Sequence, residues 1–216
     1  MNDARPRQLH VRLAAVLPEG WRDAAPWGYP RQVELALIAG VFRSQLKQSR
    51  VDELVDFVMR SRSHSLLDDL NEIVGAGEKG VVEALGPRWG DTNVLGVPVL
   101  RAAVIYNAAK ALVDLGITSA TDLQAATAER PAEVEKAVLG VRGIGPGTWG
   151  WISFLAHANV RPDAQVVAFI RESLEGDEKL SPEDAAELLR LTARRFASDE
   201  RVLAHAVRAY LDDSEA

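Results

Sequence analysis

Apolar residues recur every three or four positions along most of this chain, which is the spacing of an amphipathic α-helix. Clear examples of the pattern lie at 31–47, 99–115, 132–139 and 182–196. No segment alternates between apolar and polar positions as a half-buried β-strand does, and no internal repeat is present. We therefore expect an all-α protein of about eleven helices.

The first part of the chain has little regular structure after a short helix at 8–17. An irregular segment follows that contains Trp21, Pro26, Trp27 and Tyr29. Proline and glycine interrupt helices and strands, so this segment is expected to be a loop. Its aromatic rings are expected to pack on the core rather than line a site.

Polar and glycine-containing links predict further helix ends in the middle of the chain. We expect helices at 51–61, 66–74 and 78–85, followed by a loop from 86 to 98 that contains glycines and prolines. His64 lies in one of the polar links. An isolated histidine there is interpreted as a loop residue rather than a catalyst or a metal ligand.

The most informative stretch follows the helix at 132–139 and reads Gly143-Ile144-Gly145-Pro146-Gly147. Glycine adopts a positive φ at little steric cost, and proline fits the first turn of a helix because its missing N–H is not needed there. An apolar run continues after this turn as a second helix. The sequence therefore predicts a tight helix–hairpin–helix within 132–158.

Such a turn can bind an anion. The N–H groups of Gly143, Gly145 and Gly147 carry no side chains beside them and lie at a helix N-terminus, where the peptide dipoles favour negative charge. A DNA backbone phosphate suits this turn, whereas a dinucleotide fingerprint would need a preceding strand and a phosphate-binding P-loop would need a Lys-Ser/Thr ending. From spacing alone, a purely structural turn between packed helices is an equally good interpretation.

The segment from Gly143 to Thr148 resembles the hairpin of the helix–hairpin–helix DNA glycosylases, the HhH-GPD superfamily, which includes endonuclease-III-like and 3-methyladenine glycosylases. In that family, an aspartate follows the hairpin at the start of the next helix, and Asp163 stands in the matching place. The resemblance implies a two-lobed helical fold. Residues 31–158 would form a helical barrel domain, while 1–30 and 159–216 would join into a second lobe.

The resemblance also implies an activity, the hydrolysis of the N-glycosidic bond of a damaged or mispaired base in double-stranded DNA. Asp163 would be the catalytic carboxylate, because bond cleavage leaves positive charge on the sugar that a carboxylate stabilises. Gln45 matches a family glutamine at the end of a helix that probes the gap left by an extruded base. By itself, Asp163 is equally well explained as a helix-capping residue.

At the hairpin, the resemblance implies DNA contacts from Gly143, Gly145, Gly147 and Thr148, and we add the neighbouring basic residue Arg142. Bifunctional family members carry a lysine that attacks the sugar, and Gly147 stands in its place here. The expected enzyme is therefore monofunctional and leaves the strand intact. Trp149 replaces a residue that is usually small, so the packing of the second hairpin helix is expected to differ.

The sequence excludes an iron–sulfur cluster, and the resemblance implies an alkali ion at the hairpin. The chain has no cysteine, which excludes disulfides, thiol catalysis and the iron–sulfur cluster of many endonuclease-III-like relatives. The family hairpin often binds K⁺ or Na⁺ through backbone carbonyls, which by position would be those of Leu139, Val141 and Ile144. No other cofactor is expected.

Charge and hydropathy limit the partners further. The net charge of −6 argues against a general nucleic-acid coat. Basic islands at 43–50 and 60–62, together with Arg142 and Arg161, permit a local DNA site, although such charges are commonly solvated helix faces. No apolar run approaches the ~20 residues that span a bilayer, and the polar N-terminus is not a signal peptide. We expect a cytoplasmic monomer.

Three functions remain open at this point. The first is the monofunctional glycosylase. The second is a non-catalytic helix–hairpin–helix protein that recognises DNA or a damaged base. The third is an all-α scaffold or protein-interaction domain, which the acidic balance and the unusual Trp149 favour.

Overall fold

The computed structural model describes residues 4–22, 28–62, 66–159, 162–174 and 179–214. Over these residues the chain forms eleven α-helices and no strand, with one isolated bridge between Asn93 and Leu100. The all-α class is therefore confirmed. No helix in these ranges is both long enough and apolar enough to cross a membrane.

The chain divides into two compact units, one formed by Met1–Trp27 together with Val160–Ala216, the other by Gly28–Asn159. We call them the terminal unit and the central unit. The domain boundaries predicted from the sequence lay after residues 30 and 158. Four residues considered above lie outside the described ranges, namely Pro26, Trp27, His64 and Arg161.

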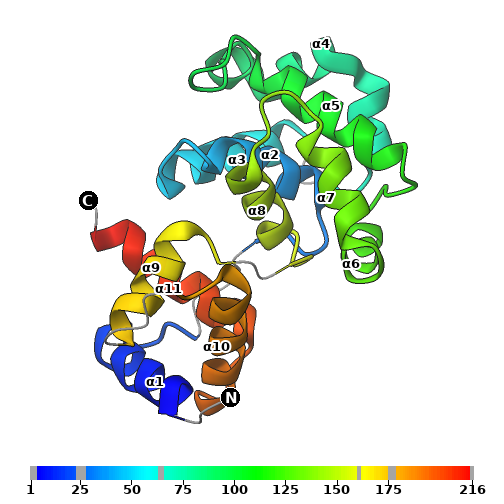
Figure 1. Cartoon of the computed structure of the whole chain (residues 1–216). Coiled ribbons are helices and arrows are strands. Elements are labelled where there is room, and N and C mark those ends of the chain that lie inside the picture. Colours follow the sequence, from blue (N-terminus) through cyan, green and yellow to red (C-terminus); the bar gives the residue numbers. More distant parts are fainter. Residues whose placement is uncertain (1–3, 23–27, 63–65, 160–161, 175–178, 215–216) are drawn as a thin grey trace. The chain divides into compact units, whose positions relative to one another are not determined.

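The central unit is built around one buried helix (Figure 1). Its helices are α2 (Val33–Arg43), α3 (Gln48–Ser61), α4 (Leu70–Trp89), α5 (Arg101–Val113), α6 (Ala120–Glu129), α7 (Pro131–Leu139) and α8 (Pro146–Leu155). Every residue of α2 is buried, and α3, α5 and α8 pack around it. Nine of its eleven residues are uncharged and apolar or glycine, and a helix with so broad an apolar surface is buried on all sides.

The helices α2 and α8 approach each other closely in the central unit. A Cβ atom on Gly40 would lie 2.8 Å from both the backbone N and the Cα of Ile152. Glycine at this position therefore lets the two helix backbones meet. Because α8 is the second helix of the hairpin, this contact fixes the hairpin on the core.

Polar groups tie the starts of several helices together. The Asp68 carboxylate accepts hydrogen bonds from the N–H groups of Val33 and Ala120, both at 2.8 Å, and so joins the beginnings of α2 and α6. Glu34 is buried; it accepts a hydrogen bond from the Asp69 N–H and lies 3.8 Å from the Arg62 guanidinium. Burial raises the pKa of the Glu34 carboxyl despite both partners.

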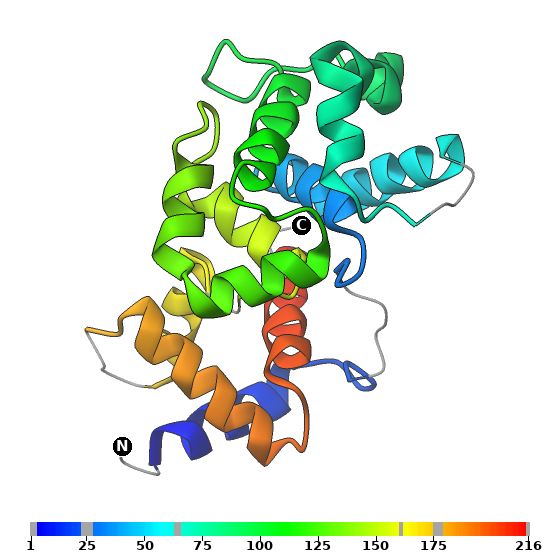
Figure 2. The same cartoon turned by 90° about the vertical axis from the view of Figure 1, so that its right-hand side faces the viewer.

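The terminal unit contains α1 (Ala4–Val16), α9 (Ala164–Ser173), α10 (Pro182–Arg195) and α11 (Glu200–Ser214). In Figure 2, α10 lies against α1 and α11, and α9 contacts all three. Of the irregular segment after α1, Trp21 is described, and its ring meets that of Phe196 edge-on with centroids 5.4 Å apart. This aromatic residue packs on the core, as predicted for its segment.

The predicted helix at 31–47 is wrong at its C-terminal end. α2 ends at Arg43, and a turn connects it to α3, which begins at Gln48. The Arg43 guanidinium folds back and donates a hydrogen bond to the Leu46 carbonyl at 3.0 Å, which stabilises the turn. Gln45 therefore lies in this turn rather than in a helix.

The predicted break between helices at 66–74 and 78–85 is confirmed, because α4 is interrupted there. The predicted limits differ from the structure, since the first helix begins at Leu70 and α4 continues to Trp89. Its backbone leaves the helical conformation at Gly77 and Gly86, where φ is 68° and 72°. Glycine adopts these angles without strain, so the helical path resumes after a single residue. A side chain at Gly86 would also collide with the Phe57 ring, since its Cβ would lie 2.6 Å from Cζ.

Candidate nucleic-acid interface

The hairpin turn joins α7 to α8 and is fixed on α5. The Ile144 N–H donates to the Val141 carbonyl at 3.0 Å, which closes the turn. Gly143 has φ of +101°, and a Cβ there would lie 2.7 Å from Cγ2 of Val104. Gly143 is thus required both for the backbone angle and for close packing on α5.

The N-terminus of α8 faces open solvent. Gly145 is the N-cap and supplies no side-chain cap, and Pro146 and Gly147 are exposed. Nothing lies within 4 Å of the position that a Cβ would take at Gly145 or Gly147. The Thr148 side chain is buried, so Thr148 can offer a ligand only its backbone N–H. The positive end of the helix dipole is accessible here without a competing side chain.

Backbone carbonyls for the predicted alkali ion surround the same turn. The Val141 oxygen accepts the Ile144 hydrogen bond, and a carbonyl oxygen keeps a second lone pair that an ion can use. Leu139 and Ile144 would supply the other two carbonyls. In the ranges described, no three His, Asp or Glu side chains lie close enough to share a metal ion. The ion at the turn stays a prediction.

A second exposed feature lies beside the turn, in the loop at 91–99 between α4 and α5. In both Figure 1 and Figure 2, this loop and the hairpin turn lie at the same edge of the central unit. Val94 is buried close to Gly143, whereas the next residue, Leu95, is 81% exposed. Single exposed apolar side chains are common on protein surfaces, so the interest of Leu95 lies in its position beside the hairpin turn.

Gln45 holds this loop in place. Its Oε1 atom accepts hydrogen bonds from the Leu95 N–H at 2.8 Å and from the Arg101 Nη2 at 2.7 Å. Arg101 is buried, its guanidinium lies 5.0 Å from the centre of the Phe42 ring, and burial lowers its pKa from the usual value. The structure therefore gives Gln45 a contact with the loop, in addition to the DNA contact that the resemblance implies.

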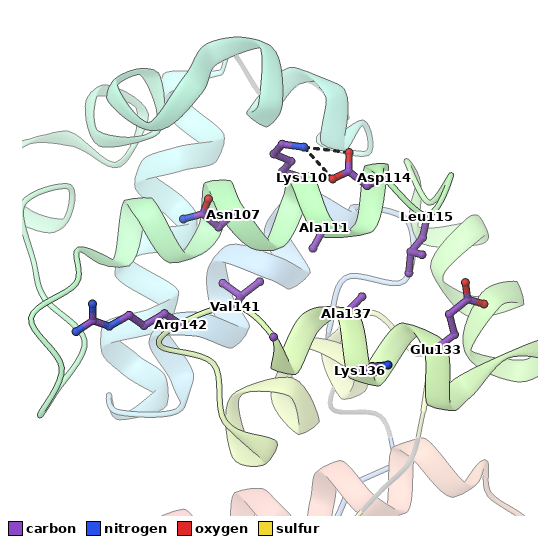
Figure 3. A pocket seen from close by; sticks show the side chains of 11 residues that line it. Asn107, Lys110, Ala111, Asp114, Leu115, Glu133, Lys136, Ala137, Val141 and Arg142 are labelled. Carbon is purple, nitrogen blue, oxygen red and sulfur yellow. Dashed lines mark hydrogen bonds and ion pairs between the residues drawn. The ribbon is translucent and has the colours of Figure 1, made fainter.

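An open groove of about 650 Å³ runs between α5 and α7 up to the hairpin (Figure 3). Arg142 and Asn107 lie at the end near the turn, and Glu133 lies at the other end. Lys110 is paired with Asp114 at 2.8 Å, which neutralises both charges. Glu133 is likewise paired, with Arg130 at 3.3 Å. Arg142 therefore makes the groove basic where it adjoins the hairpin.

Asp163 belongs to the terminal unit and is the N-cap of α9. Its Oδ1 atom accepts hydrogen bonds from the N–H groups of Gln165 and Val166, both at 2.9 Å. Its Oδ2 atom lies 3.3 Å from Nη1 of Arg208 on α11. The capping interpretation of Asp163 is confirmed, and a catalytic role stays a prediction.

The structure thus gathers Gln45, Arg142 and the hairpin glycines in the central unit and places Asp163 in the terminal unit. Two residues that matter here, Leu95 and Arg208, are not among the site residues predicted from the sequence. A leucine next to glycine in a loop was a usable signal for Leu95. No local signal pointed to Arg208, because its partner lies on a different helix.

Residues 8–211 match a protein family described as "Domain of unknown function (DUF8548)". The chain belongs to this family. The matched region takes in parts of both compact units and includes the hairpin, the 91–99 loop and Asp163. No curated protein and no solved structure matches the chain.

Proposed function

We propose that this chain is a monofunctional DNA N-glycosylase that excises a damaged or mispaired base from double-stranded DNA. The observation that carries the proposal is the uncapped, exposed N-terminus of α8 next to the exposed Leu95 loop, on one edge of the central unit. The resemblance of the hairpin and of Asp163 to the HhH-GPD glycosylases supports the same function.

The hairpin would hold one DNA strand. The N–H groups of Gly147 and Thr148 point out of the first turn of α8, where a phosphate gains both hydrogen bonds and the favourable end of the helix dipole. Arg142, on the turn itself, would add a charged contact, and the basic end of the α5–α7 groove would receive the neighbouring phosphate. These contacts bind any sequence, which suits an enzyme that searches for damage.

Leu95 would enter the base stack. Apolar side chains that wedge between bases are a common way to open a duplex, and a target base must leave the stack before its glycosidic bond can be reached. The hydrogen bonds from Leu95 and Arg101 to Gln45 hold the loop in position when Leu95 is pressed against the base stack. Gln45 would thereby support the wedge at the gap in the duplex.

Asp163 would serve the bond-breaking step. As the bond between the sugar C1′ and the base nitrogen breaks, the electron pair leaves with the base and positive charge develops on the sugar. The carboxylate stabilises that charge and orients a water, whose oxygen bonds to C1′ while its proton passes to the departing base or to the carboxylate. The products are a free base and an abasic site. Because Gly147 offers no amine, the strand stays uncut.

A second function is favoured by one specific observation. Both carboxylate oxygens of Asp163 already have structural partners, the N–H groups of α9 and Arg208. A residue so engaged is fully accounted for without catalysis. The alternative is therefore a non-catalytic helix–hairpin–helix protein that binds DNA or a damaged base through the central unit.

One experiment separates the two functions. Duplex oligonucleotides bearing uracil, hypoxanthine, 3-methyladenine, 8-oxoguanine or an oxidised pyrimidine are incubated with the protein, and strand breaks are scored with and without alkali. Breaks that need alkali establish a monofunctional glycosylase and name its substrate. Breaks without alkali contradict the inference from Gly147. No breaks, together with salt-dependent binding of the same duplexes, select the non-catalytic protein.

The hairpin contact predicts a charge effect at Gly147. Gly147→Glu should weaken DNA binding about 10-fold relative to Gly147→Gln, because the two side chains differ only in a negative charge placed where the phosphate binds. Both fit, since nothing lies within 4 Å of a Cβ at this position. Fluorescence anisotropy with a labelled duplex measures the difference. Equal affinities of the two variants would show that DNA does not contact α8.

The wedge predicts an effect at Leu95. Leu95→Ser should lower the affinity for a duplex with a mismatched pair about 10-fold and reduce the fluorescence rise of a 2-aminopurine beside the mismatch. Leu66→Ser is the matched control, because Leu66 is another exposed leucine of the central unit, 70% exposed. If both variants unstack the 2-aminopurine as the wild-type protein does, Leu95 does not enter the duplex.

A further inference from the structure

We infer that Arg208 is the positioning residue for the Asp163 carboxylate in the excision reaction, an inference that rests on the proposed function. Arg208 lies on α11, the last helix of the chain, and Asp163 lies at the start of α9. Its guanidinium Nη1 is 3.3 Å from the Asp163 Oδ2 atom and also donates to the Oε1 atom of Gln165.

The two oxygens of Asp163 have different tasks. Oδ1 accepts two backbone N–H groups and is committed to capping α9. Oδ2 is the oxygen that can face a sugar, and Arg208 contacts that oxygen. The Asp163 side chain is 35% exposed, whereas that of Arg208 is only 12% exposed. The carboxylate is therefore accessible, and the guanidinium supports it from the protein side.

Three restraints hold the carboxylate in one orientation. The two N–H groups fix Oδ1, and Arg208 fixes the rotation that remains about the side chain. The contact of Arg208 with Gln165 holds the guanidinium itself against the first turn of α9. A carboxylate held in this way needs no reorganisation when positive charge appears on the sugar, which is the condition for efficient electrostatic stabilisation.

The ion pair also affects the approach to DNA. An isolated carboxylate is repelled by phosphates, and this repulsion is strong where water is excluded. With Arg208 beside it, the pair has no net charge, so Asp163 can come near the backbone without a large penalty. The same guanidinium weakens the negative potential that the sugar experiences. For Arg208 to increase the excision rate, the gain from holding the Asp163 carboxylate in place must exceed this loss of negative potential at the sugar.

The test is single-turnover excision at saturating protein with the substrate identified by the duplex panel. Arg208→Met should lower the rate about 10- to 100-fold, a range typical of small misplacements of a catalytic group. The dissociation constant for the duplex should also rise, because the Asp163 charge is no longer compensated, and saturating protein keeps this weaker binding out of the measured rate. Arg208→Lys, which keeps the charge but loses the planar fork, should have an intermediate rate.

Two further variants exclude a merely structural role. Arg190→Met removes another arginine–carboxylate pair of the terminal unit, that with Glu187 on α10, and should leave the excision rate unchanged. In an Asp163→Asn background, Arg208→Met should cause no additional loss, because Arg208 acts through Asp163. If Arg208→Met does not fold, Arg208→Lys at the wild-type melting temperature decides the question.

An Arg208→Met rate equal to or above the wild-type rate overturns the inference and leaves the proposed glycosylase intact. So does a further loss in the Asp163→Asn background. If the wild-type protein excises no base from any duplex, the proposed function fails, and the role of Arg208 fails with it. The two failures are thus distinguished by whether the wild-type protein is active.

Discussion

Asp163→Asn is expected to lower the single-turnover excision rate at least about 100-fold, the size of effect seen when one preorganised electrostatic group is lost from an active site. Asparagine keeps the shape of the side chain and is as good an N-cap as aspartate, so α9 should remain intact. The largely buried Arg208 keeps its hydrogen bond to Gln165 when the ion pair is lost, and the melting temperature of the variant measures the effect on stability. Alkali-dependent strand breaks measure the excision rate. Fluorescence anisotropy measures the DNA affinity, which Asp163→Asn should retain.

A matched control is present in the same unit. Asp199 caps α11 through a hydrogen bond from the Arg201 N–H at 2.8 Å, which is the interaction that Asp163 makes with α9. Asp199→Asn therefore repeats the chemical change at a cap without a proposed catalytic role, and its excision rate should equal that of the wild-type protein. Activity of Asp163→Asn within about twofold of that control would remove Asp163 from the mechanism.

Gly40→Ala is expected to lower the free energy of unfolding of the central unit by about 3 kcal/mol, the upper end of the usual range for overpacking. The new methyl group would meet the backbone N and Cα of Ile152 at 2.8 Å and its Cγ1 at 2.5 Å. A side-chain atom can move aside, but a backbone can do so only if α8 shifts away from α2. Because α8 begins at the hairpin, DNA binding should weaken along with stability.

Gly150→Ala is the control for this change. Gly150 lies inside α8, where nothing is within 4 Å of a Cβ. Alanine there should raise stability by up to about 1 kcal/mol through helix propensity. Urea denaturation followed by tryptophan fluorescence measures both variants, because Trp89, Trp149 and Trp151 belong to the central unit. A Gly40→Ala variant as stable as the wild-type protein would mean that the two helices can separate without loss.

The burial of Trp149 changes the balance among the three functions. Its side chain is 6% exposed and belongs to the core of the central unit. The scaffold interpretation drew on this residue as an unusual feature of the hairpin helix. Because Trp149 packs in the core of the central unit, it no longer supports the scaffold function. Only the acidic net charge of the chain still favours that function.

Local signals explain what could be predicted from the sequence. Helical periodicity established the all-α class, and the run of glycines with Pro146 established the hairpin between α7 and α8, because both depend on neighbours within a few residues. The cap at Asp163 was the alternative to its predicted catalytic role, and it too depends only on neighbouring residues. The interruptions of α4 at Gly77 and Gly86 also follow from a local signal, because glycine adopts a positive φ without strain, whereas the packing of the Phe57 ring on Gly86 does not.

Tertiary structure alone decided how the site residues are supported. The hydrogen bonds that join Gln45 to Leu95 and Arg101 connect residues 50 and 56 positions apart, and the ion pair of Asp163 reaches another helix. Whether Leu95 is exposed depends on where the 91–99 loop packs, not on the loop's own composition. The sequence by itself therefore determined the helices, the turn and the cap, whose energies are local. Side-chain partners and accessible surfaces arise only when distant helices pack together, and a single sequence carries no local trace of that packing.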